Sequence, residues 1–135
     1  MTHLDLNVQT IQAIYAAFGK GDVPRILALS TEDAEFSFAG ASPAVPWHGP
    51  WRGRGGITHF FAAIAEGVEF RAFEPMSFAS GTDAVAVRLH LTYQVRGSGR
   101  VVDEHQVHWW TLRDGKVCGL VHFEDTAQVI AAIRP

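Results

Sequence analysis

Residues 83–95 read DAVAVRLHLTYQV, and apolar and polar side chains alternate along them. A period of two is typical of a strand that turns one face toward the core. One face is predicted to carry Val85, Val87, Leu89, Leu91 and Tyr93, and the other Ala84, Ala86, Arg88, His90 and Thr92. This strand predicts that the second half of the chain forms a sheet.

Turn signals extend the sheet on both sides of this strand. RGSGR at residues 96–100 predicts a hairpin that leads into a strand over residues 101–113. Asp114-Gly115 predicts the next tight turn, because this pair favours the backbone angles of two-residue hairpins. The other two expected strands cover residues 68–79, interrupted near Pro75, and residues 117–124. Together the four strands predict an antiparallel meander.

The beginning of the chain has the spacing of a helix instead. Four residues recur at the i, i+3, i+4 and i+7 positions of one helix face: Ile11, Ile14, Tyr15 and Phe18. They predict an amphipathic helix over residues 5–18, ended by Gly19. Asp22 is the expected N-cap of a short second helix. The remaining expected elements are a strand, a third helix and a terminal helix, at residues 33–38, 56–66 and 126–133.

This order of elements predicts a single α+β domain over residues 1–135. Helices that precede a meander can cover only one face of its sheet. The uncovered face must then be polar or pack against another subunit. A chain of 135 residues has the length of one domain and can bury a substantial core.

Composition excludes several classes of partner. The net charge is −3 and no cluster of Lys and Arg occurs, which argues against nucleic acid. No run approaches the roughly 20 apolar residues of a membrane span, and the first residues lack the apolar core of a signal peptide. The single Cys118 excludes an internal disulfide framework and fits a reducing compartment. We therefore expect a cytoplasmic protein that binds neither membrane nor nucleic acid.

Four motifs then occur in order along the chain. They are YAAFGKGD at residues 15–22, GRGGI at 53–57 before Phe60-Phe61, HWWTLRDGKV at 108–117 and FEDT at 123–126. With them the chain resembles the SnoaL-like, ketosteroid-isomerase-related proteins of the nuclear transport factor 2-like superfamily. The resemblance implies a cone-shaped, cystatin-like domain in which a curved antiparallel sheet wraps around three N-terminal helices and encloses an aromatic-lined pocket.

The catalytic residues of true ketosteroid isomerases are not found at the matching positions. Those enzymes use an Asp base and an oxyanion hole of a Tyr and a protonated Asp. The matching positions hold Ile14 for the Tyr, Phe38 for the base and Val107 for the acid. Steroid isomerisation is therefore not expected, and the fold itself hosts several activities.

The resemblance also predicts which strand residues face the pocket. In the family register, the strand over residues 101–113 turns His105, Val107 and Trp109 inward, and the last strand turns Leu120, His122 and Glu124 inward. We expect His122 to act as general base or acid, oriented by Glu124, with Tyr15 donating a hydrogen bond to the substrate and His105 nearby. The alternative is that these groups are hydrogen-bonded pocket walls without a catalytic role.

The expected ligand is a small apolar ring-bearing molecule. Its predicted pocket lining is Phe18, Phe36, Phe38, Trp47, Trp51, Phe61, Trp109 and Leu120. The two Trp of the irregular stretch 39–56 either close over the pocket or pack this stretch onto the third helix. His48 and His59 have no visible partner in the sequence and are expected to be exposed. No metal-ligand spacing occurs, so neither metal nor cofactor is expected.

The outer face of the sheet is predicted to carry Arg88, His90, Thr92, His108 and Trp110. A Trp there is costly to leave in water, so we expect a homodimer that forms through this face. Two function classes remain open. One is a cofactor-independent isomerase, cyclase, dehydratase or hydrolase, and the other is a non-catalytic binding or dimeric interaction module.

Overall fold

The helices come first along the chain and most of the sheet follows. The computed structural model describes residues 2–135, and His3 by its backbone alone. The elements are α1 (His3–Gly19), α2 (Val23–Ala28), β1 (Ser30–Phe38), β2 (Trp51–Arg52), α3 (Gly53–Gly67), β3 (Val68–Ser80), β4 (Ala84–Val95), β5 (Val101–Arg113), β6 (Lys116–Phe123) and α4 (Thr126–Ile133). None of the helices in this range is long and apolar enough to cross a membrane.

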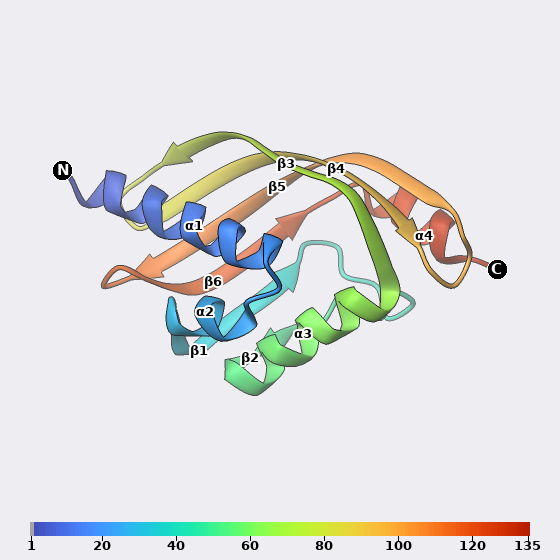
Figure 1. Ribbon diagram of the computed structural model, residues 1–135, viewed down its shortest axis with the longest axis horizontal. Helices are drawn as coiled ribbons and strands as arrows, with labels where there is room; N and C mark the ends of the chain where they lie inside the picture. The colour runs from blue at the N-terminus through green and yellow to red at the C-terminus, as the bar shows by residue number, and fades with distance from the viewer. Residues whose placement is uncertain (1) are drawn as a thin grey trace.

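One curved sheet of six strands arches over the first three helices (Figure 1). The strand order is β2-β1-β6-β5-β4-β3, and β3 to β6 form the predicted antiparallel meander. β1 joins β6 in parallel, a pairing that the sequence did not predict. α1 and α3 lie under the concave face, and α4 lies at the far end of the sheet. The α+β fold class is confirmed.

Local sequence signals set the element ends. The Thr2 side chain accepts a hydrogen bond from the Asp5 N–H, which starts α1, and the Asp22 carboxylate caps α2 through the Arg25 N–H at 3.1 Å. Asp114 and Gly115 have φ angles of 52° and 78°, as a type I′ turn between β5 and β6 requires. The Asp22 cap and the Asp114-Gly115 hairpin agree with the predictions, whereas α1 begins two residues before its predicted start.

The faces of β4 are as predicted, but those of β5 are reversed. Each residue of β5 with an even number points toward the helices, so Trp110 is 2% exposed whereas Trp109 is 47% exposed. The inward set includes Glu104, Gln106, His108 and Trp110, and the outward set includes His105, Val107 and Trp109. The predictions that His105, Val107 and Trp109 face inward, and that His108 and Trp110 face outward, are therefore wrong.

A β-bulge in the β5–β6 hairpin causes this reversal. Next to the turn, Leu112 lies opposite Val117, but Thr111 lies opposite Gly119. Cys118 is the extra residue, and an extra residue shifts the pairing beyond it by one. A shift of one residue exchanges the two faces of a strand relative to its partner.

His122 shows the consequence for the interior. Pairing without a bulge from the Asp114-Gly115 turn would place His122 opposite Val107, as the family register implied. With the bulge, His122 lies opposite His108. Two histidines from neighbouring strands therefore meet on the concave face.

Candidate functional site

A cavity of about 70 Å³ lies between the concave face of the sheet and the helices. Most of its wall is aromatic or aliphatic, which is typical of small-molecule sites. The polar side chains in the wall are Tyr15, Tyr93, Gln106, His108 and His122. Of the predicted lining, Tyr15, Phe18, Phe36, Phe38, Trp47, Phe61, Leu120 and His122 lie around this cavity.

A chain of hydrogen bonds runs along β5 on one wall of the cavity. The Trp110 indole N–H donates to the Tyr15 hydroxyl oxygen (3.0 Å), and this hydroxyl is hydrogen-bonded to His108 Nδ1 (2.8 Å). His108 Nε2 is hydrogen-bonded to Gln106 Oε1 (2.9 Å), and Gln106 Nε2 donates to Glu104 Oε2 (3.3 Å). The alternation of β5 places the last three side chains in line on one face.

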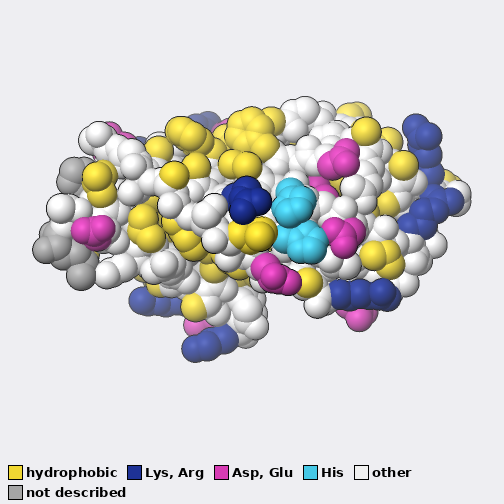
Figure 2. All heavy atoms as spheres, turned by 90° about the horizontal axis from the view of Figure 1, so that it is seen from above, with side chains coloured by type: hydrophobic (Ala, Val, Ile, Leu, Met, Phe, Trp, Pro, Cys, Tyr) yellow, Lys and Arg dark blue, Asp and Glu magenta, His cyan; other side chains and the backbone are white. Residues whose placement is uncertain are grey.

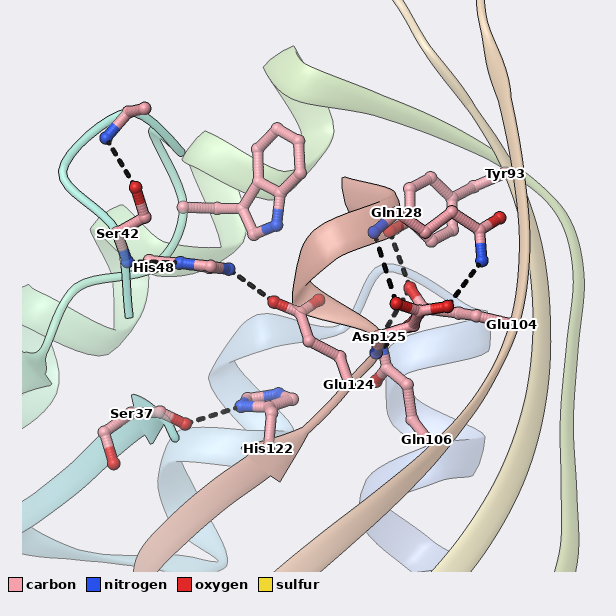
Figure 3. A network of polar contacts seen from close by, with 12 residues as sticks. Ser37, Ser42, His48, Tyr93, Glu104, Gln106, His122, Glu124, Asp125 and Gln128 are labelled. Carbon is pink, nitrogen blue, oxygen red and sulfur yellow. Dashed lines mark hydrogen bonds and ion pairs between the residues drawn. The ribbon is translucent and has the colours of Figure 1, made fainter. Parts of the chain in front are cut away.

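Glu104 is the acceptor at the end of this chain (Figure 3). It also accepts hydrogen bonds from the Tyr93 hydroxyl (2.7 Å) and the Asp125 N–H (2.9 Å). Burial raises the pKa of the Glu104 carboxyl, while its hydrogen bonds, that from Tyr93 first, favour the charged form.

Burial controls the protonation of the other members. It holds the pKa of His108 well below its ordinary value, and the neighbouring His122 adds to that effect. It also raises the pKa values of Tyr15 and Tyr93. At neutral pH both tyrosines are therefore protonated and His108 is neutral.

His122 lies at the centre of the aromatic wall. Its ring stacks on Phe38 with a centroid distance of 4.0 Å and meets the His108 ring edge-on at 4.7 Å. Its Nδ1 is 2.9 Å from the Ser37 carbonyl oxygen, which can only accept, so Nδ1 carries the proton. None of the side chains that the structure describes forms a hydrogen bond to Nε2. Burial lowers the pKa of His122 from 6.5 to about 4, so Nε2 holds a lone pair at neutral pH.

Glu124 does not orient His122, contrary to the prediction. Its Oε1 is hydrogen-bonded to Nε2 of His48, and both side chains are 1% exposed. The Ser42 N–H donates to Nδ1 of His48 (2.9 Å), so Nε2 carries the ring proton and donates it to Glu124. The predicted exposure of His48 is therefore wrong, whereas His59 is exposed as expected.

This His48–Glu124 pair joins the loop at residues 39–50 to the end of β6 (Figure 3). The same loop carries Trp47, which is buried in the cavity wall. Gly67 makes room for its ring, because a Cβ there would lie 2.6 Å from the indole. Trp51 is outside the cavity and donates from Nε1 to the Trp47 carbonyl oxygen (3.0 Å).

Sequence reasoning missed the principal polar residues of this site. The sequence predicts an outward His108, identifies no role for Glu104 or Gln106, and places Tyr93 in the core, whereas all four side chains point toward the concave side of the sheet. The alternation of β4 was the available signal, because cross-strand partners share a face. Leu91 faces inward and lies opposite Glu104, so Glu104 must face inward too.

The site differs from that of a ketosteroid isomerase in its polar groups. Ile14 and Phe38 line the cavity where the resemblance would require Tyr and Asp. Val107 faces outward, and its inward neighbours are Gln106 and His108, neither of which is an acid. Among residues 2–135, no group of three or more His, Cys, Asp or Glu side chains is arranged to hold a metal ion.

Comparison with known proteins gives the following matches. The family model described as SnoaL-like domain matches residues 11–120. No curated protein matches the chain. An NTF2-like protein from Burkholderia xenovorans LB400 is 29% identical, with a TM-score of 0.88 over 97% of this chain and 98% of its own.

Two further solved structures are similar over nearly their whole length. TerC, which was co-crystallised with polyporic acid, is 27% identical, with a TM-score of 0.84 over 95% of this chain and 98% of its own. An NTF2-like protein from Burkholderia pseudomallei K96243 is 23% identical, with a TM-score of 0.88 over 100% of both chains, and shows likeness of fold alone.

The first prediction concerns the buried pair. His48→Ala should destabilise the protein by about 1–3 kcal/mol, because the buried Glu124 is left without its donor. Urea unfolding at pH 7 measures this, with His59→Ala at an exposed position of α3 as the matched control. Equal midpoints for the two variants would show that the pair does not hold the loop.

The second prediction concerns pH. The unfolded chain binds a proton at His122 below pH 6.5, whereas the folded chain binds it only below about 4. Stability should therefore fall as the pH falls from 6.5 to 4, by about 3 kcal/mol for this residue at about 1.4 kcal/mol per pKa unit. His122→Asn keeps a donor for Ser37 and should flatten the slope relative to wild type, unlike the control His59→Asn. Parallel slopes in all three proteins would contradict a neutral buried His122.

Proposed function

Because the chain belongs to the SnoaL-like domain family, we propose that it binds a small ring-bearing organic compound in the aromatic cavity and transfers a proton to His122 without a cofactor. The observation that carries this proposal is the unpartnered Nε2 lone pair of a buried, neutral histidine in the cavity wall. TerC, with its polyporic acid, supports an organic ligand for this kind of cavity. The reaction would be of the isomerase, cyclase, dehydratase or hydrolase type.

His122 is suited to accept a proton because its ring is fixed. The Ser37 carbonyl holds Nδ1–H, and Phe38 and His108 hold the ring plane. A base that is already oriented needs no reorganisation when the substrate arrives. Glu124 supports this site indirectly, because its bond to His48 holds the loop that carries Trp47.

Non-catalytic binding is the second candidate. The polar groups of Tyr15 and His108 are already hydrogen-bonded to other side chains, as in a rigid wall. A pKa of about 4 also makes His122 a weak base. Binding without conversion of the bound compound distinguishes this candidate from the enzyme.

Native mass spectrometry of the purified protein should reveal a retained aromatic compound. His122→Asn should keep that compound but convert it, or exchange its protons in D₂O, at least about 100-fold more slowly than wild type. Leu120→Phe fills the cavity and should lose the compound, whereas Val121→Phe on the neighbouring outward position should retain it. Unchanged turnover in His122→Asn excludes the catalytic role, and retention by Leu120→Phe excludes this cavity.

We also propose that two copies pair through the outer face of the sheet. Figure 2 views this face and shows histidine side chains near its centre, flanked by basic, acidic and hydrophobic side chains. The exposed apolar residues there include Val107, Trp109 and Phe123, of which Val107 and Phe123 lie opposite each other on β5 and β6. Apolar side chains gathered on one sheet face favour an isologous interface.

Light scattering at micromolar concentration should give twice the 14.8 kDa mass of one chain. Trp109→Glu should give the single mass, because it places a charge in the proposed interface. Leu6→Glu, at an exposed apolar position of α1, is the matched control and should stay dimeric. A wild-type protein of single mass would exclude this dimer.

A further inference from the structure

The hydrogen-bond chain along β5 has a direction, and Glu104 sets it. Three donors meet the Glu104 carboxyl group and favour its ionised form, and an ionised carboxylate can only accept hydrogen bonds. Glu104 has three donors: the Tyr93 hydroxyl at 2.7 Å, Gln106 Nε2 at 3.3 Å and the Asp125 N–H at 2.9 Å. The amide nitrogen of Gln106 must therefore point toward Glu104, and its oxygen must point the other way.

The orientation of Gln106 fixes the ring proton of His108. Gln106 Oε1 accepts the bond from His108 Nε2 at 2.9 Å, so Nε2 carries a proton. Burial keeps His108 neutral by holding its pKa well below the ordinary value, so the ring has this one proton only. Nδ1 of His108 is then a bare acceptor.

The hydroxyl proton of Tyr15 is therefore used in the hydrogen bond to His108. Its hydroxyl must donate to His108 Nδ1 at 2.8 Å, while its oxygen accepts from the Trp110 N–H at 3.0 Å. The oxygen keeps a lone pair but has no proton left for a ligand. His122, whose ring is 4.7 Å from that of His108, also offers a lone pair, on Nε2.

We propose that ionised Glu104 holds the Tyr15–His108–His122 end of the cavity in an acceptor-only state, so that this end selects a ring bearing a hydroxyl group. A phenol or enol O–H can donate to His122 Nε2 or to the Tyr15 oxygen, whereas a ketone or ether oxygen would face lone pairs. This reverses the donor role that the sequence suggested for Tyr15. The ligand class rests on the proposed function, but the direction of the chain does not.

Glu104 is a positioning residue in this scheme, because it acts through Gln106 and His108. In Glu104→Gln the new amide can donate to Gln106, which can then turn over and donate to His108 Nε2. His108 would carry its proton on Nδ1, and the Tyr15 O–H would be free to meet an acceptor. The charge of Glu104 therefore decides whether this end of the cavity accepts hydrogen bonds from a ligand or donates them.

The direction is testable without any ligand. Long-range ¹H–¹⁵N NMR at pH 7 should show the proton of His108 on Nε2 in wild type and on Nδ1 in Glu104→Gln. Asp103→Asn, the adjacent carboxylate on the outer face, should keep the wild-type tautomer. A proton on Nδ1 in wild type, or an unchanged tautomer in Glu104→Gln, overturns the proposal. The wild-type spectrum alone decides the direction if Glu104→Gln does not fold.

The ligand class is tested with 2-naphthol and 2-methoxynaphthalene as probes, and naphthalene as the probe that lacks oxygen. Fluorescence titration of the wild-type protein should give at least about tenfold tighter binding of 2-naphthol than of either other compound. The preference over 2-methoxynaphthalene should shrink in Glu104→Gln. Equal affinities in wild type overturn the hydroxyl preference while leaving the binding function intact. Failure of all three to bind overturns the ligand class, and an empty protein in native mass spectrometry then removes the proposed function as well.

Discussion

The pairing of β5 with β6 beyond Cys118 is the constraint on which the interior depends. With the bulge, His108 lies opposite His122, and Glu104, Gln106 and Trp110 share the concave face. Without it, the outward and inward sets of β5 would be exchanged relative to β6. The exchanged arrangement would turn Asp103, His105, Val107 and Trp109 inward and would take Glu104, Gln106 and His108 out of the interior. One inserted residue therefore decides which set of polar side chains of β5 faces the interior.

Such a wall is tolerated only because its members satisfy one another. A buried polar group without a partner costs about 1–3 kcal/mol, and a charged one costs more. Glu104 has three donors, and both ring nitrogens of His108 are hydrogen-bonded. Loss of any link leaves its neighbour unpaired in a medium of low polarity. Because most polar atoms of the wall are already hydrogen-bonded to one another, few of them remain free to form a hydrogen bond with a ligand.

The sequence predicted the elements better than their faces. The alternation of β4 identifies its core face, because the large apolar side chains between Val85 and Tyr93 all lie on one side of the strand. The alternation of β5 does not identify its core face. Its inward face reads Val, Glu, Gln, His, Trp, Leu from residue 102, and its outward face also mixes apolar and polar side chains. The bulge at Cys118 has no local signal comparable to Asp114-Gly115. The pairing of His48 with Glu124 joins positions 76 residues apart in the sequence, and no motif connects them.

The size of the cavity sets a further condition on any ligand. A cavity that admits one benzene ring is on the order of 150 Å³, about twice the volume of this cavity. An apolar groove of about 460 Å³ adjoins it and shares wall residues that include Phe18, Phe61 and Phe70. Phe18 and Phe61 are only partly buried, with ring centroids 5.9 Å apart, and come from α1 and α3. Movement of this pair would enlarge the cavity toward the groove, and would couple ligand binding to the packing of α1 against α3 as well as to the polar wall.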